Sequence, residues 1–171
     1  MSKSWVARDD DASGAWHYMT EIERLVDELH WVFAGGAWHG PALAEALAGV
    51  TAGQAAARPI ARAHSIWEIV LHLLSASRVV CRRLEGEPAD ATGAEDWPPV
   101  VETNEAAWSK LKEALAESQR ELLAGVSSLS DAALDRPIVE GFATVYRTLH
   151  GHAQHVAYHA GQIMALRKAL E

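Results

Sequence analysis

The segment from about Ser65 to Leu84 constrains the fold most strongly, because it is a helical stretch with apolar residues on nearly every face. A helix of this kind is stable only when it is buried on more than one side. We therefore expect a central helix that other elements of the chain surround. Part of its surface is expected to lie in a subunit interface, which predicts a homodimer. Its apolar residues include Ile66, Trp67, Ile69, Val70, Leu71, Leu73 and Leu74.

Three further segments show the spacing of amphipathic helices, and no segment shows sustained strand alternation. They cover about Trp16 to Phe33, Glu105 to Val126 and Val145 to Leu170, with a short helical turn after Pro41. The connections between the later helices are long and rich in proline, glycine and small residues. The pattern predicts an all-α protein, a four-helix bundle with long connections, formed as a single domain over residues 1–171.

Charge and composition exclude several classes of partner. The formal net charge is -8 and the basic residues are scattered, so a phosphate backbone would be repelled and nucleic acid is not expected. The most apolar run, "IWEIVLHLL", is far shorter than the roughly 20 residues that span a bilayer, so no membrane association is expected. A single cysteine and an amino terminus without a signal-type apolar run predict a cytoplasmic protein.

The stretch "GHAQHVAYHAGQI" places several histidines on one face of the last predicted helix. Residues three, four and seven apart share a helix face, so His152, His155, His159 and Gln162 form one stripe. His155 and His159 are one turn apart, which lets both imidazoles reach the same ion. This spacing predicts two ligands of a metal site.

Two ligands hold a transition metal poorly, so a third is expected from a facing helix. His72 is the leading candidate because it lies within the most apolar helix, where an unpaired imidazole is costly to bury. The sequence thus predicts that His72, His155 and His159 converge near one end of the core. His152 could be a fourth ligand or a second-shell donor. The remaining histidines are not expected in the site: His17, His30, His39, His64 and His150.

Two segments together resemble the DinB/YfiT-like superfamily of metal-binding four-helix bundles: "HSIWEIVLHLLSASRVV" and "HVAYHAGQIMALRKAL". The resemblance covers nearly the whole chain and includes the loop "DWPPV". It implies a divalent metal ion, zinc or nickel, held by three histidines and completed by water. It also implies either a transferase or isomerase that uses a low-molecular-weight thiol, or a metal-dependent hydrolase. The family's motif falls on His72, His155, His159, Gly161 and Gln162.

Three neutral ligands would leave one coordination position open, and such a site can activate a bound water or thiol. A nearby proton acceptor is then needed. Glu68, one turn before His72, is expected to act as a base or second-shell partner, and Gln162 and Tyr158 are weaker candidates. Two functions remain open: a metal-dependent enzyme with a small-molecule substrate, and a non-catalytic metal-binding or small-molecule-binding protein of a stress response. A fourth protein ligand would favour the second.

Overall fold

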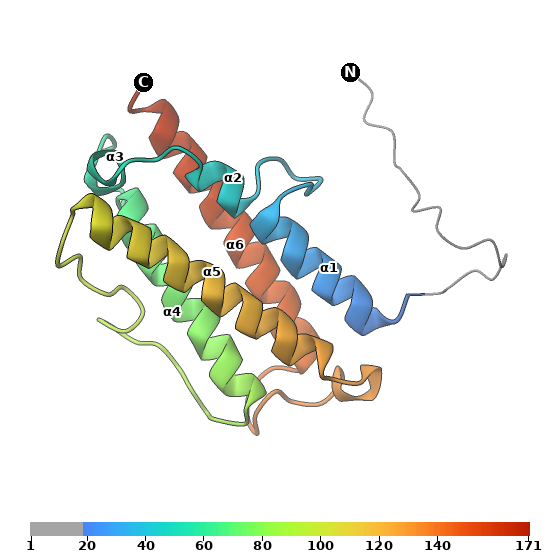
Figure 1. Cartoon of the computed structure of the whole chain (residues 1–171). Helices are drawn as coiled ribbons and strands as arrows, with labels where there is room; N and C mark the ends of the chain where they lie inside the picture. Colours follow the sequence, from blue (N-terminus) through green and yellow to red (C-terminus); the bar gives the residue numbers. More distant parts are fainter. Residues whose placement is uncertain (1–18) are drawn as a thin grey trace, which may run out of the picture.

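Four long helices lie side by side in the computed structural model, which describes residues 19–171 (Figure 1). No strand occurs within this range, so the prediction of an all-α four-helix bundle is confirmed. The long helices are α1 (Glu21–Ala34), α4 (Ile66–Leu84), α5 (Glu105–Ser127) and α6 (Val145–Lys168). The short elements are α2 (Leu43–Leu47), α3 (Ala52–Ala56) and the 3-10 turn η1 (Asp131–Ala133).

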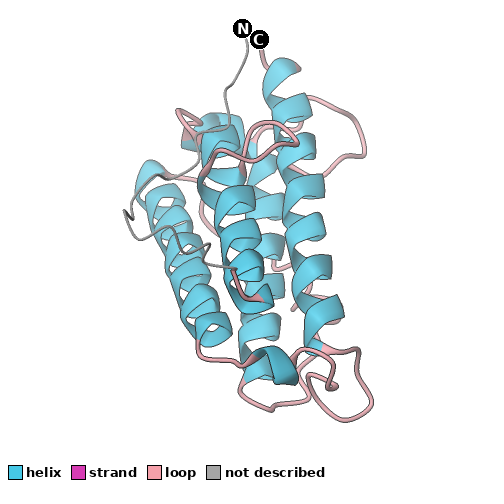
Figure 2. Cartoon of the chain, turned by 90° about the vertical axis from the view of Figure 1, so that its right-hand side faces the viewer, coloured by secondary structure: helices cyan, strands magenta, loops and turns pink. Residues whose placement is uncertain are grey.

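The long helices form a square in which α4 packs against α5 and α6, and α1 packs against the same two helices. α1 and α4 are therefore diagonal to each other, as are α5 and α6. α4 and α5 run away from the end of the bundle that carries α2 and α3, whereas α1 and α6 run toward it (Figure 1). Because α4 and α5 are parallel, residues 85–104 must return along the bundle. In Figure 2, the axes of the long helices lie roughly along the long axis of the bundle.

Side-chain caps set where the helices begin. Thr20 and Glu23 form a capping box, in which the threonine hydroxyl accepts from the Glu23 N–H and the Glu23 carboxylate accepts from the Thr20 N–H. α1 therefore begins at Glu21, later than the predicted start at about Trp16, a residue that lies outside the described range. Asn104 caps α5 as predicted, with its Oδ1 2.8 Å from the backbone nitrogen of Ala107.

Most of the apolar surface of α4 is covered within the chain. Ile66, Trp67 and Val70 are buried, and Trp67 contacts the fully buried Trp108 of α5. The indole N–H of Trp108 donates to the carbonyl of Val50, 2.8 Å away, which ties the α2–α3 region to the same core. The requirement that α4 be buried on several sides is thus met largely by α5, α6 and residues 85–104.

Across residues 19–171, no helix combines the length and the apolar character that crossing a membrane requires. α4 is rich in apolar residues, yet it still carries His72 and a basic last turn.

Candidate metal centre

Three histidine side chains from two neighbouring helices converge in the bundle. His72 comes from the second turn of α4, and His155 and His159 come from the middle of α6. The Nε2 atom of His155 lies 2.9 Å from Nε2 of His72 and 2.9 Å from Nε2 of His159. The cluster lies nearer the start of α4 than its end, and at the middle of α6. The convergence itself is as predicted.

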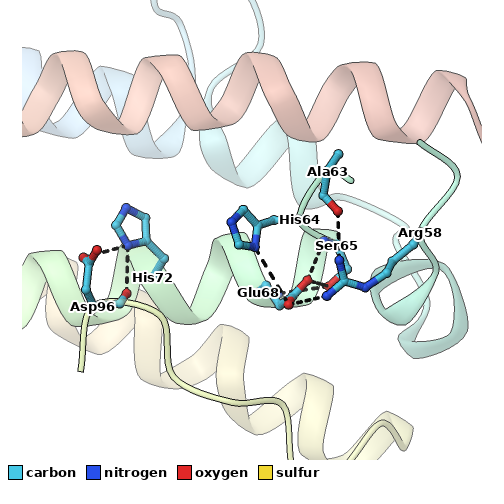
Figure 3. Close-up of polar contacts among 7 residues, drawn as sticks. All are labelled: Arg58, Ala63, His64, Ser65, Glu68, His72 and Asp96. Atoms are coloured by element: carbon cyan, nitrogen blue, oxygen red, sulfur yellow. Dashed lines mark hydrogen bonds and ion pairs between the residues drawn. The ribbon is translucent and has the colours of Figure 1, made fainter. Parts of the chain in front are cut away.

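The outer nitrogens of two of these rings are held by hydrogen-bond acceptors. The Nδ1–H of His72 donates to the backbone carbonyl of Asp96, 2.8 Å away, and lies 3.1 Å from the Asp96 carboxylate (Figure 3). The Nδ1–H of His159 donates to Oε1 of Gln162, 2.7 Å away. Since a neutral imidazole carries one proton, both rings present an unprotonated Nε2 to the centre of the cluster.

These lone pairs make the cluster suited to a cation. His155 can place at most one proton between its own Nε2 and its two neighbours, so at least one pair of nitrogens faces each other without a hydrogen. A divalent ion would satisfy all three lone pairs. In a tetrahedral site with Zn–N bonds of about 2.0–2.1 Å the nitrogens stand about 3.3 Å apart, so each of the two pairs now at 2.9 Å needs to separate by only a few tenths of an ångström.

A family model described as the DinB superfamily matches residues 37–163, which include all three histidines. The chain belongs to the DinB superfamily. Neither the curated proteins nor the solved structures contain a match to it. Family membership and the three-histidine cluster both fit metal binding, as the resemblance implied.

Burial keeps His155 and His159 of this DinB-superfamily protein in the neutral form that binds metals. It lowers the pKa of His159 to about 4, and neighbouring His155 acts in the same direction. Burial also lowers the pKa of His155, with a further contribution from His72. At neutral pH both rings are therefore uncharged.

His152 lies beside the cluster but is not one of its ligands. Among the described residues, only His72, His155 and His159 bring ligand atoms within 4.8 Å of one another. His152 is buried, and burial lowers its pKa to about 4. Its ring lines an open groove of about 470 Å³ together with His72 and His155. The described residues therefore offer three candidate ligands here and leave room beside them.

Asp96 is the acidic residue next to His72, a position that the sequence analysis expected Glu68 to fill. Glu68 is the acidic half of a capping box with Ser65, and Figure 3 shows its carboxylate turned toward Ser65 and Arg58. Burial raises the pKa of Glu68, but the Ser65 hydrogen bonds and the Arg58 charge outweigh this and lower it below its usual value. The Glu68 carboxylate is thus ionised, and it is held by its contacts with Ser65 and Arg58.

Trp97 completes the surroundings of the cluster and was not anticipated as a site residue. Its ring stacks on His72, with centroids 4.1 Å apart and planes within 2° of parallel. The opposite face stacks on His64 at 3.7 Å, although His64 was expected to lie outside the site. The loop that contains Asp96 and Trp97 thus fixes the His72 ring in two ways. Asp96 accepts the hydrogen bond from Nδ1–H, and Trp97 stacks on the face of the ring.

Replacing Asp96 by asparagine is expected to weaken zinc binding about tenfold. Loss of such an outer partner typically costs roughly 10–100-fold in affinity, and the backbone carbonyl of Asp96 remains as an acceptor for His72. Affinity would be measured by competition with a chromophoric chelator. Asp90→Asn is the matched control, since Asp90 lines the same groove but pairs with Arg83. Equal affinities in the two variants would contradict a role for the Asp96 carboxylate.

Proposed function

We propose that this protein is a zinc- or nickel-dependent enzyme that joins a low-molecular-weight thiol to a small molecule, as an S-transferase or thiol-dependent isomerase. The observation that carries the proposal is the ligand set: three neutral imidazoles, no fourth protein ligand among residues 19–171, and an open groove beside them. A closed four-ligand site would instead favour a structural or storage role.

The surroundings favour a thiol over water as the nucleophile. A divalent ion supplies a Lewis acid that lowers the pKa of a coordinated group. Within the described residues no carboxylate belongs to the ligand cluster, and the nearest one, on Asp96, is engaged with His72. A thiol with a pKa of about 8.5 gives up its proton far more readily than water does, so it depends less on a free base.

The thiol would have to come from outside the protein. Burial raises the pKa of Cys81, the only cysteine, to about 11, with Glu121 and Glu85 adding to the effect. Its sulfhydryl therefore stays protonated at neutral pH and is a poor nucleophile. A soluble thiol is abundant in the reducing cytoplasm, which is the location we propose for this protein.

We assign Glu68 a supporting role in this site. Its carboxylate caps α4 through Ser65, pairs with Arg58 and lies 3.8 Å from His64. His64 stacks on Trp97, and Trp97 stacks on His72. Glu68 would thus help to fix the ligand-bearing turn of α4.

Cobalt(II) substitution provides the test of this function. Low-molecular-weight thiols added to the cobalt-loaded protein are expected to produce a sulfur-to-cobalt charge-transfer band, and thiol conjugation of electrophilic substrates is expected to require the metal. Ester or amide hydrolysis that proceeds without any thiol would identify a hydrolase instead. A metal-loaded protein that binds no thiol and turns over neither class of substrate would support the non-catalytic alternative.

We also propose that the protein forms a homodimer through the outer face of α4. Leu71 and Val79 are only half-buried there, and they line a groove of about 340 Å³ between α4 and residues 85–104. Light scattering at micromolar concentration is expected to report twice the 18.5 kDa chain mass. Val79→Glu would place a charge in the interface and is expected to yield monomers. A wild-type protein that is already monomeric would contradict this proposal.

A further inference from the structure

The groove beside the histidine cluster continues along α6 for two turns. Arg147, Gly151 and His155 all line it, and their spacing of four residues places them in one row on the helix. With a rise of about 1.5 Å per residue, the Arg147 and His155 backbones stand about 12 Å apart along the axis. A molecule anchored at the cluster can therefore extend toward Arg147.

Arg147 is the one charged residue in this groove whose side chain has no protein partner among the described residues. Arg83 lies 3.3 Å from the Asp90 carboxylate, donates to the carbonyl of Ala89 and lies over the Phe142 ring. Asp96 pairs with His72. Once these pairs are set aside, the Arg147 guanidinium is left as an exposed positive charge at the far end of the groove.

Gly151 is a second feature of this row, and it leaves the space beside α6 open. It lies inside α6, where glycine is a poorer helix former than alanine. A Cβ atom added here would meet nothing within 4 Å, and no positive φ calls for glycine at this position. Neither packing nor backbone conformation explains the glycine. What it does is keep the groove floor free of a side chain between Arg147 and His155.

We propose that the groove binds an anionic small molecule, with one end at the metal centre and a distal carboxylate paired with Arg147. This inference rests on the proposed function, because it takes the thiol-binding position at the metal as the anchor. Arginine suits the role because its planar guanidinium can hold a carboxylate through two parallel hydrogen bonds. Gly151 provides the surface over which the connecting chain of the ligand passes.

The test compares thiols that differ only at their far end. Mercaptohexanoate and mercaptooctanoate would be titrated into the full-length cobalt-loaded protein, each against the neutral mercapto-alcohol of equal length. The sulfur-to-cobalt band reports binding without any turnover. The acids are expected to bind about three- to fivefold more tightly than the alcohols, because solvent screens an ion pair with an exposed arginine.

Two variants, with a control, test whether the difference in affinity between acids and alcohols arises in the groove. Arg147→Gln is expected to remove the preference for the acid and leave the affinity for the alcohol unchanged. The matched control is Arg78→Gln, an exposed arginine on α4 that does not line this groove and should retain the full preference. Gly151→Leu is expected to weaken binding of the long acids and to leave binding of mercaptoethanol intact, with no loss of helicity.

The outcomes separate this inference from the proposed function. If no thiol gives a band, thiol binding at the metal fails, and the inference fails with it. If thiols bind but acids and alcohols bind equally, or if Arg147→Gln and Arg78→Gln behave alike, the carboxylate site is overturned and the proposed function stands.

Discussion

Replacing His155 or His159 with alanine is expected to reduce metal content to near zero while the helical bundle persists. Each change removes one of three ligands, which should cost more than the roughly 10–100-fold loss caused by removing an outer partner. The core does not depend on the ion, because the buried apolar residues come from all four long helices. Removing one imidazole also relieves the opposed lone pairs, so the metal-free variants should be no less stable than the metal-free wild type.

Metal content would be measured by mass spectrometry after zinc or nickel loading and gel filtration, with helicity followed by circular dichroism. His30→Ala is the matched control, because His30 is exposed on α1, a helix that contributes no ligand. Full occupancy in both ligand variants would exclude the site. Loss of helicity with the metal would instead show that the ion is structural.

Acidification is expected to destabilise the metal-free protein between about pH 6.5 and pH 4. Burial lowers the pKa of His152 from 6.5 to about 4, so the unfolded chain takes up a proton in this range and the folded chain does not. The loss of unfolding free energy begins at the unfolded pKa, is complete near the folded pKa, and amounts to about 3 kcal/mol for this one residue. His155 and His159, whose pKa values are also lowered, act in the same direction.

Urea unfolding at a series of pH values, with and without zinc, measures this pH dependence of the free energy of unfolding. Replacing His152 by leucine should flatten the pH dependence of the metal-free protein. The additional stability from zinc should remain nearly constant down to about pH 6 and disappear toward about pH 4, where protons displace the ion from His159. A stability profile that His152→Leu leaves unchanged would contradict the burial of a neutral imidazole.

The long helices were predictable because each carries a strong local signal. α4, α5 and α6 follow the apolar spacing to within a few residues, and Asn104 is a recognisable cap. The start of α1 was misplaced because the apolar periodicity was followed past the capping box of Thr20 and Glu23. α3 was overlooked for the same reason, since Thr51 and Gln54 form a capping box at its start. Both capping boxes can be recognised in the local sequence, but the apolar periodicity does not reveal them.

The convergence of the three histidines was predictable because the spacing on α6 and the apolar neighbours of His72 on α4 are both visible in the local sequence. Asp96 and Trp97 were not, because a loop residue's contact with a helix depends on where the loop crosses the bundle. Both residues belong to the segment "DWPPV", which contributed only to the family resemblance. Glu68 was assigned to the site from its position one turn before His72, although it is also the third residue after Ser65. That spacing marks a capping box, which is the arrangement in the structure.

An anomalous diffraction map from a crystal of the zinc-loaded protein would locate the ion itself. We expect one peak about 2.0–2.1 Å from Nε2 of each of His72, His155 and His159, with the remaining coordination filled by solvent or a small molecule. A peak elsewhere in the molecule, or a fourth protein side chain that closes the coordination sphere, would contradict this expectation.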